Sequence, residues 1–336
     1  MKILYVTDFQ TISTQTGGYI SDYLNDLTFH GLKQLYGKDV TALIPPVHLY
    51  KENQGGVYNN CSWIWLSYNA GRNYIFQTDD IERHFWGGMT SFYLLNKDYD
   101  PIVLDGTIEE RKEWLDSIRD RIVSKEFDLI IWGNARRCLH LFKDAKKIYP
   151  KEQLILLDGN DDTELLDLAD QGYPYFKREL SDYSNLPSNI KPITFSYPEE
   201  KIGRRTKNKT QKRGTVIPGD EKTYIFKSDG FSLDMEKKYY KDYNKSYFGL
   251  TEKKAGWDCM RHYEIMGNYC LPYFPDLAFC PENTLYNFPK ELIIEGNRLM
   301  HSFNETKYYS LLEEMFKYFK KHLTTKAVAK ELINRI

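Results

Sequence analysis

Two short apolar runs with a helical pattern between them constrain the fold of this chain more than any other feature. The runs are Tyr247 to Leu250 and Cys270 to Phe274, and the helical spacing extends from Trp257 to Tyr269. The expected inner positions of that helix are Met260, Tyr263, Ile265 and Met266. Two apolar strands joined through a helix make a βαβ crossover, so the strands should be parallel in one sheet. The chain is therefore predicted to be an α/β protein.

The loop between the first apolar run and the helix has the composition of an anion site. It contains Lys253, Lys254, Ala255 and Gly256 directly before the start of the predicted helix. In a βαβ unit this loop lies at the carboxyl edge of the sheet, where open α/β sheets bind their ligands. Cations beside the free backbone N–H groups of a helix start favour a phosphate.

Within the predicted helix, Arg261 and Glu264 are three residues apart and share a face. A carboxylate at this position can accept hydrogen bonds from the vicinal hydroxyls of a sugar. The alternative is an Arg–Glu pair on the surface, which would contribute well under about 1 kcal/mol. The spacing alone leaves both interpretations open.

The segment GWDCMRHYEIMGNYCLPYFPD, which spans residues 256 to 276, resembles the donor-binding segment of GT-B glycosyltransferases. In that segment a helix carrying a Glu leads through a turn of small residues into a strand with Pro. The CgeB-like and exostosin-like branches are the most similar. The resemblance implies two Rossmann-like doubly wound domains that face a cleft, and a last helix that crosses back to the first domain.

The same resemblance implies a nucleotide-sugar site. Glu264 would hold the ribose, and Lys253, Lys254 or Arg261 would face the diphosphate. The implied donor-binding residues are Lys253, Lys254, Gly256, Trp257, Arg261 and Glu264. Retaining members of the fold often carry another Glu eight positions before the ribose Glu, where this chain has Gly256. The stereochemical outcome therefore stays open.

The first half of the chain alternates between strand and helix patterns, which favours a doubly wound parallel sheet. The strands are expected at 2–6, 39–45, 61–67, 127–132 and 153–157, and the helices at 19–36, 108–124 and 139–148. The pair Gly17 and Gly18 follows the first strand without spelling GxGxxG, so a dinucleotide-dependent dehydrogenase is disfavoured. We expect these glycines to form an acceptor or phosphate loop.

The composition changes after residue 200, where a polar and basic stretch without periodicity includes Arg204 and Arg205. We expect an N-terminal Rossmann-like acceptor domain at 1–200, a linker or mobile basic loop at 201–221, and a C-terminal nucleotide-sugar donor domain at 222–336. Functional alternatives for the basic stretch are a grip on phosphate and contact with a polyanionic acceptor. The segments 175–180 and 193–197 are expected to close the first domain. A strand is expected at 223–226, a strand or short helix at 289–294, and helices at 235–245, 307–319 and 325–336.

Transfer of a sugar requires stabilisation of the leaving diphosphate and, when configuration inverts, a base that deprotonates the acceptor. Asp8, which follows the first strand, is the first candidate for the base, and Asp158 is the second. For either residue the alternative role is a helix cap or turn. His262 is expected either to be a packing residue or to support a residue of the site without touching the ligand. The sequence Asp98-Tyr99-Asp100 has the Asp-x-Asp spelling of a metal site but precedes Pro101 in a polar loop, which favours a surface turn.

Composition excludes other classes. A net charge of −1 gives no global electrostatic argument for nucleic acid or an acidic membrane. The five cysteines form no CxxC pair, which is typical of reduced thiols in a cytoplasmic protein. No run approaches the roughly 18 apolar residues of a membrane span, and the first residues enter a strand without a signal sequence.

The resulting hypothesis is a metal-independent glycosyltransferase without a cofactor, which moves a hexosyl or pentosyl group from a nucleotide-diphosphate-sugar to a saccharide or glycoconjugate acceptor. One alternative is a DNA-base glycosyltransferase of the same fold acting on modified DNA. Another is a non-catalytic nucleotide-sugar binding protein. The base, the sugar, the acceptor and the oligomeric state are not readable from the sequence.

Overall fold

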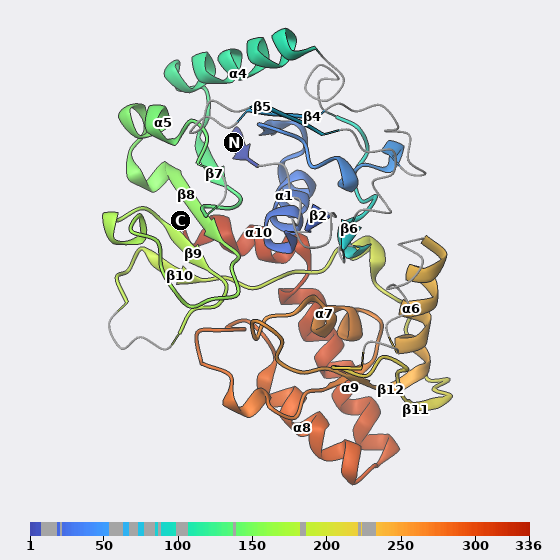
Figure 1. Ribbon diagram of the computed structural model, residues 1–336. Coiled ribbons are helices and arrows are strands. Elements are labelled where there is room, and N and C mark those ends of the chain that lie inside the picture. The colour runs from blue at the N-terminus through green and yellow to red at the C-terminus, as the bar shows by residue number, and fades with distance from the viewer. Residues whose placement is uncertain are drawn as a thin grey trace.

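The computed structural model describes residues 1–7, 19–20, 22–53, 63–66, 73–76, 85–86, 89–98, 107–136, 139–181, 186–220, 223 and 233–336. Among the described residues, the two largest β-sheets are both parallel, one with six strands and one with three (Figure 1). We call the six-stranded sheet with its covering helices the first unit, and the three-stranded sheet with its helices the second unit. The predicted α/β class is confirmed.

The first sheet is parallel throughout and has the order β10-β9-β8-β7-β1-β3. Its strands are β1 (Ile3–Val6), β3 (Val40–Ala42), β7 (Leu129–Trp132), β8 (Leu154–Asp158), β9 (Tyr175–Lys177) and β10 (Ile190–Pro192). Every residue of β1, β7, β8 and β9 is buried, as expected for a sheet covered on both faces. The chain order reverses between β1 and β7, which makes their carboxyl ends a topological switch point.

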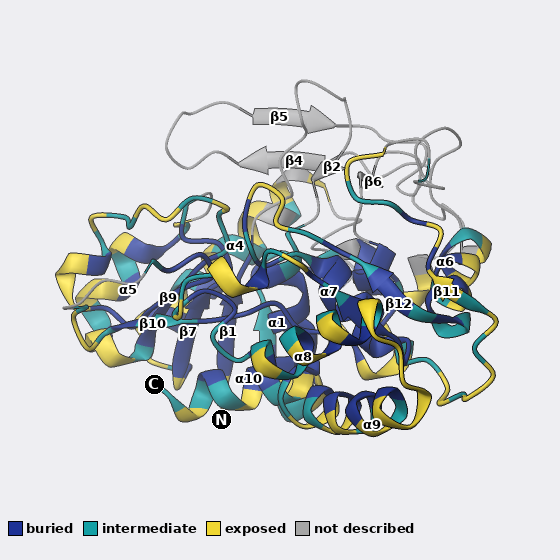
Figure 2. Ribbon diagram, turned by 90° about the horizontal axis from the view of Figure 1, so that it is seen from below, coloured by how far each residue is buried: buried dark blue, intermediate teal, exposed yellow. Residues whose placement is uncertain are grey.

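Alternate residues of the first sheet enter two different cores. Ile3 and Tyr5 of β1 pack into a cluster shared with Leu24 of the helix α1 (Tyr23–Tyr36), whereas Leu4 and Val6 pack with the other cluster. That other cluster includes side chains of α4 (Ile108–Val123) and α5 (Phe142–Ile148). Because strand side chains alternate between faces, helices cover both sides of the sheet, as a doubly wound unit requires. Figure 2 shows the buried strands between these helices.

Two small sheets lie apart from the six-stranded sheet. The strand β2 (Tyr19–Ile20) pairs in parallel with β6 (Phe85–Trp86), and β4 (Trp63–Leu66) pairs antiparallel with β5 (Asn73–Phe76). The strand predicted at 61–67 therefore exists at its centre, but its expected place in the doubly wound sheet was wrong. Short 3-10 helices are η1 (Gly37–Asp39), η2 (Val47–Leu49), η3 (Lys51–Asn53), η4 (Met89–Ser91), η5 (Lys151–Gln153), η6 (Ala169–Gln171), η7 (Glu199–Lys201) and η9 (Leu277–Phe279).

The second sheet has the order β11-β12-β13, and all its described strands are parallel. These are β11 (Gln211–Arg213), β12 (Ser246–Leu250) and β13 (Leu271–Tyr273), with helices α6 (Leu233–Lys245), α7 (Met260–Gly267), α8 (Lys290–His301) and α9 (Glu305–His322). The predicted βαβ crossover is confirmed as β12-α7-β13, although α7 begins three residues later than expected. The strand β11 lies inside the stretch predicted as a linker. Of the strand predicted at 223–226, Thr223 is outside any strand and the rest lies outside the described residues.

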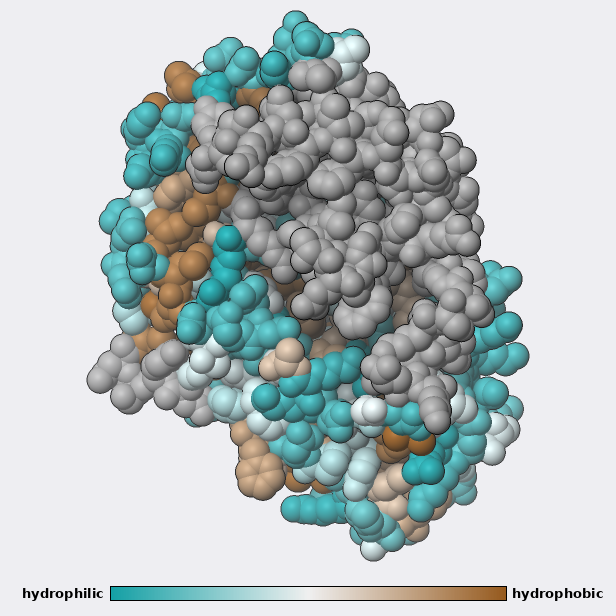
Figure 3. Space-filling view, viewed as in Figure 1, coloured by the Kyte–Doolittle hydropathy of each residue, from teal (hydrophilic) through white to brown (hydrophobic). Residues whose placement is uncertain are grey.

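The carboxyl-terminal helix α10 (Thr325–Asn334) returns to the first unit and packs against α1 (Figure 1). His30 Nδ1 lies 2.9 Å from Thr325 Oγ1, and the chain just before α10 pairs with the first unit's Tyr197 through a bridge to Thr324. On the face shown in Figure 3, hydrophobic residues gather on the first unit beside α5 and β8, and hydrophilic residues dominate the second unit.

Close packing of α1 on α10 depends on Gly31. A Cβ atom added there would lie 2.7 Å from the backbone carbonyl carbon of Thr325 and 2.8 Å from Ala329 Cβ. We expect Gly31→Ala to lower the free energy of unfolding by about 1–3 kcal/mol through overpacking, although Ala is the better helix former by about 1 kcal/mol. Chemical denaturation followed by circular dichroism measures this. Gly296→Ala in α8 is the control, since its nearest neighbours lie 3.7 Å away; an equal loss in both variants would contradict the packing argument.

Candidate functional site

The helix α7 is buried on all sides, and this changes the interpretation of its two charged residues. Arg261 and Glu264 are each 4% exposed, as buried as their apolar neighbours. The alternative of a solvated Arg–Glu pair on the surface is therefore wrong. Burying an ionised group is costly unless it is paired and hydrogen-bonded, so the partners of Glu264 decide what this carboxylate does.

Both oxygens of the Glu264 carboxylate accept hydrogen bonds from hydroxyl groups. Thr90 Oγ1 donates to Oε1 at 2.5 Å and the Tyr239 hydroxyl donates to Oε2 at 2.8 Å. Tyr239 belongs to α6 in the second unit, whereas Thr90 belongs to η4, which packs on α1 in the first unit. Glu264 therefore lies at the contact between the two units. Burial, followed by the charge of Glu264, raises the pKa of Tyr239 well above its usual value, so this hydroxyl stays a donor.

More hydroxyl and charged groups extend this cluster. The Tyr240 and Thr90 hydroxyls are 3.1 Å apart, and Tyr243 donates to the Tyr239 hydroxyl at 3.0 Å. Lys201 donates to both the Glu236 carboxylate and the carbonyl of Met89, the residue before Thr90. Burial lowers the pKa of Lys201 and raises that of Glu236. Sequence reasoning missed this set, because its members come from distant segments without a shared local pattern.

The loop before α7 already holds an anion that belongs to the protein. The buried Glu179 carboxylate accepts hydrogen bonds from the backbone N–H groups of Trp257 at 3.0 Å and Asp258 at 2.8 Å. A Cβ at position 256 would lie 2.5 Å from Glu179 Oε1, so Gly256 permits this close approach. The expectation that the loop N–H groups are free is therefore wrong for Trp257 and Asp258. A phosphate at this place would have to replace Glu179.

Arg178 neutralises this buried carboxylate. Its Nη1 donates to Glu179 Oε1 at 2.8 Å and to the Asp258 carbonyl at 2.5 Å, and its Nε donates to the Gly159 carbonyl at 2.9 Å. The guanidinium also pairs with Asp161. Arg178 and Glu179 follow β9 directly, so the carboxyl edge of the first sheet is clamped to the loop before α7.

The two lysines of this loop remain at the surface. Lys253 and Lys254 are exposed, and the Lys253 ammonium lies 5.8 Å from the centre of the half-buried Trp257 ring. Exposed ammonium groups beside an aromatic ring can meet an anionic ligand without prior rearrangement of the core. Among the predicted donor residues, the structure thus places Glu264 at the contact between the units, buries Arg261 in α7 and leaves Lys253 and Lys254 at the surface.

The candidate base Asp158 lies in the interior of the first unit. It has no exposed surface and accepts hydrogen bonds from Arg136 Nε at 2.9 and 3.0 Å, from Lys177 Nζ at 3.2 Å and from the Tyr175 hydroxyl. The backbone N–H of Asn160 adds a further bond at 3.1 Å. A base must reach the proton that it removes. This geometry fits an anchor for the strand ends and gives no support to Asp158 as the base.

The switch point of the first sheet has polar groups at the start of α1. Asp22 caps this helix by accepting from the N–H of Asn25, and it also accepts from the side chain of Asn134, which follows β7. Asp8, Gly17 and Gly18 lie outside the described residues, so their predicted roles stay predictions. The end of β1 at Val6 puts Asp8 two residues beyond this edge in the sequence.

The expectation that His262 is a packing residue is confirmed. Its Nδ1 lies 2.8 Å from Thr251 Oγ1, its Nε2 lies 2.8 Å from the Trp257 carbonyl, and its ring stacks on Phe274 at 4.4 Å. Burial lowers its pKa to about 3. A neutral histidine with both nitrogens engaged is a structural element of α7.

The basic stretch is used partly inside the protein. Lys209 donates to the backbone carbonyls of Asn244 and Tyr269, and Lys201 is engaged as described above. Arg204 and Arg205 are both exposed, although Arg205 also pairs with Glu313 at 3.2 Å and lies over the Phe316 ring. Lys201 and Lys209 are thus engaged inside the protein, whereas the other cations between residues 201 and 213 are exposed: Arg204, Arg205, Lys207, Lys212 and Arg213. A polyanionic acceptor therefore stays an alternative.

Two other features lie away from the cluster. Asp98 of the Asp-x-Asp triplet pairs with Lys33, and the other two residues of the triplet lie outside the described part. Within the described residues, no group of three His, Cys, Asp or Glu is placed to hold a metal ion.

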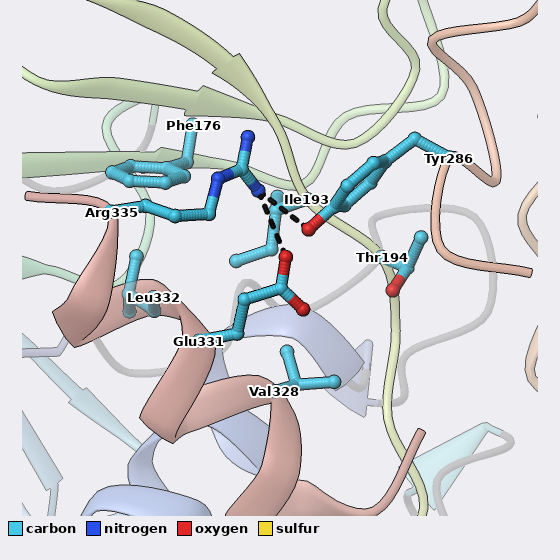
Figure 4. A pocket seen from close by; sticks show the side chains of 8 residues that line it. All are labelled: Phe176, Ile193, Thr194, Tyr286, Val328, Glu331, Leu332 and Arg335. Atoms are coloured by element: carbon cyan, nitrogen blue, oxygen red, sulfur yellow. Dashed lines mark hydrogen bonds and ion pairs between the residues drawn. The ribbon is translucent and has the colours of Figure 1, made fainter. Parts of the chain in front are cut away.

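A cavity lies between β9, the Ile193 segment, α10 and the loop at Tyr286 (Figure 4). There Arg335 donates to the Tyr286 hydroxyl at 2.7 Å and pairs with Glu331, so its polar groups serve the joint between the units.

The fold defines the class of this protein as α/β, with a six-stranded and a three-stranded parallel sheet that are both compatible with Rossmann-like units. No protein-family model matches the chain. A search of curated protein sequences finds no significant match either. Within the described residues, no helix combines the length and apolar character needed to cross a membrane.

Proposed function

We propose that this protein is a glycosyltransferase of the GT-B type, which transfers a sugar from a nucleotide-diphosphate-sugar to a saccharide or glycoconjugate acceptor. The observation that carries the proposal is the position of Glu264. This carboxylate lies on the helix of a parallel βαβ unit, at the contact between two α/β units, and each of its oxygens accepts a hydroxyl hydrogen bond. Two carboxylate oxygens that bind two hydroxyls match the vicinal diol of a ribose.

The surrounding charges support a diphosphate beside that ribose. Arg261 lies on the same face of α7 as Glu264, and the exposed Lys253 and Lys254 precede the helix. Cations placed where negative charge develops stabilise a leaving diphosphate. In the proposal, Asp8 beyond the end of β1 deprotonates the acceptor, and the cations of the protein stabilise the negative charge of the leaving diphosphate.

We expect Glu264→Gln to weaken binding of the nucleotide-sugar by about 1.5–3 kcal/mol, the contribution of a hydrogen bond to a charged group. Titration calorimetry with UDP, CDP, GDP, ADP and their sugar conjugates measures this. The matched control is Glu295→Gln in α8, where Glu295 forms a surface pair with Arg298 at 2.8 Å. Undiminished affinity in the Glu264 variant would remove the ribose from this position.

Turnover distinguishes a glycosyltransferase from the alternative, a non-catalytic nucleotide-sugar binding protein. A glycosyltransferase releases nucleoside diphosphate continuously when donor and acceptor are both present, whereas a binding protein saturates without product. A panel of saccharide acceptors, followed by release of nucleoside diphosphate, distinguishes the two. Binding of the donor without release under any acceptor would favour the binding protein.

A further inference from the structure

The two hydroxyl groups that donate hydrogen bonds to the Glu264 carboxylate come from different parts of the molecule, and one of them takes the place of a ligand hydroxyl. Tyr239 is on α6, next to α7 within the second unit. Thr90 is 174 residues away in sequence from Glu264 and belongs to the first unit. Its hydroxyl presents to Oε1 the same donor that a ribose hydroxyl would present. The predicted ribose position is thus partly filled by the protein.

The placement of Thr90 is fixed from both sides. The carbonyl of Met89 accepts a hydrogen bond from Lys201, which also pairs with Glu236. The hydroxyl of Ser91 donates to Asp26 Oδ2 at 3.4 Å, and His48 Nε2 lies 2.8 Å from the same oxygen. Because both neighbours of Thr90 are anchored and η4 is buried, the contact with Glu264 is built into the structure.

In the loop before α7, a group of the first unit again occupies a position that was predicted for the ligand. There the carboxylate of Glu179, also from the first unit, accepts from the N–H groups of Trp257 and Asp258, where a phosphate oxygen was expected. A hydroxyl at the ribose position and a carboxylate at the phosphate position both come from the first unit, and both bind groups of the second. The contact between the units therefore imitates the two polar parts of a nucleotide.

We propose that the Thr90 hydroxyl is an internal competitor for the ribose, which occupies Glu264 in the ligand-free protein and must be displaced when the donor binds. This inference rests on the proposed function. Glu264 cannot stay buried and charged without donors, so Thr90 stabilises the closed contact until a ribose hydroxyl replaces it. Donor binding is thereby coupled to the loss of one hydrogen bond between the units.

The test compares Thr90→Val, which removes the hydroxyl at nearly constant shape, with Thr90→Ser, which keeps it. We expect Thr90→Val to bind the preferred ribonucleoside diphosphate about tenfold more tightly than the wild type, a change of about 1.4 kcal/mol, and Thr90→Ser to bind like the wild type. UDP, CDP, GDP and ADP are the probes, titrated by calorimetry. Thr90→Ala serves as the second variant if Thr90→Val does not fold.

A nucleotide without ribose hydroxyls tests whether the gain depends on the contact between the ribose and Glu264. The gain in Thr90→Val should vanish for the 2′,3′-dideoxy form of the same diphosphate, because that ligand has no hydroxyl to compete for Glu264. If the wild type binds but Thr90→Val binds equally or more weakly, or gains as much with the dideoxy probe, the internal competitor is refuted and the proposed function stands. If no nucleotide binds to the wild type or to any variant, the proposed function fails and this inference fails with it.

Discussion

The Arg178→Met variant is expected to lose about 3–5 kcal/mol of the free energy of unfolding, the cost of removing one partner of a buried ion pair. Arg178 is 1% exposed and its guanidinium bonds the Glu179 carboxylate, the carbonyls of Gly159 and Asp258, and Asp161. Methionine fills most of the volume but leaves the Glu179 charge and two carbonyls without this cation. The loss should therefore exceed what the removed contacts contribute by themselves.

Urea denaturation followed by circular dichroism measures this change. Arg298→Met is the matched control, because Arg298 forms an exposed pair with Glu295 on α8 and should cost under about 1 kcal/mol. The double variant Arg178→Met/Glu179→Gln should lose less than the sum of its single changes, since the second substitution removes the uncompensated charge. A loss in Arg178→Met no larger than in the control would show that the clamp between β9 and the α7 loop contributes little.

Asp258 is expected to make stability depend on pH in the direction opposite to that of an ordinary paired carboxylate. Its side chain is buried beside the α7 loop, and Oδ2 accepts from the backbone N–H of Phe195 at 2.8 Å. Burial raises the pKa of this carboxyl to about 7, against the opposing attraction of Arg178. Between its unfolded pKa of 3.8 and about 7, the folded protein binds the proton more tightly than the unfolded chain.

The free energy of unfolding therefore falls as the pH rises. The stabilisation from protonated Asp258 is fully present below its unfolded pKa and is lost as the pH rises through about 7. Relative to Asp258→Asn, which carries no charge at any pH, the wild type should lose up to about 4 kcal/mol between pH 4 and pH 8. Parallel urea titrations of both proteins across this range measure the difference. A difference that is flat with pH, or that grows in favour of the wild type at high pH, would contradict a buried carboxyl with a raised pKa.

Local periodicity located the βαβ unit of the second sheet and the central strands β1, β7 and β8 of the first. The apolar runs at 247–250 and 270–274 became the parallel strands β12 and β13, and the inner positions of α7 are buried. The frequent aromatics mostly fill cores in the described part, as Tyr5, Tyr197 and Tyr263 show. Periodicity succeeds here because alternation between faces and helical spacing are properties of the neighbouring residues themselves.

Periodicity failed where the partner of a segment was distant. The run at 61–67 reads as a buried strand, yet β4 pairs with β5 outside the main sheet. The basic stretch lacks any period, yet β11 adds to β12 because the edge of the second sheet offers hydrogen-bonding groups to it. Strand pairing depends on which edge is available, and a single segment does not carry that information.

The sequence alone determined an α/β chain and located Glu264 on the helix of a parallel βαβ unit. Only the tertiary structure decided what surrounds that carboxylate, because Thr90 and Tyr239 reach it from two separate segments. It also decided that Glu179 fills the loop where free N–H groups were expected. A buried charge is stable only with hydrogen-bonding partners. Here those partners are distant in the sequence, so they follow from the packing of whole units and not from local spacing.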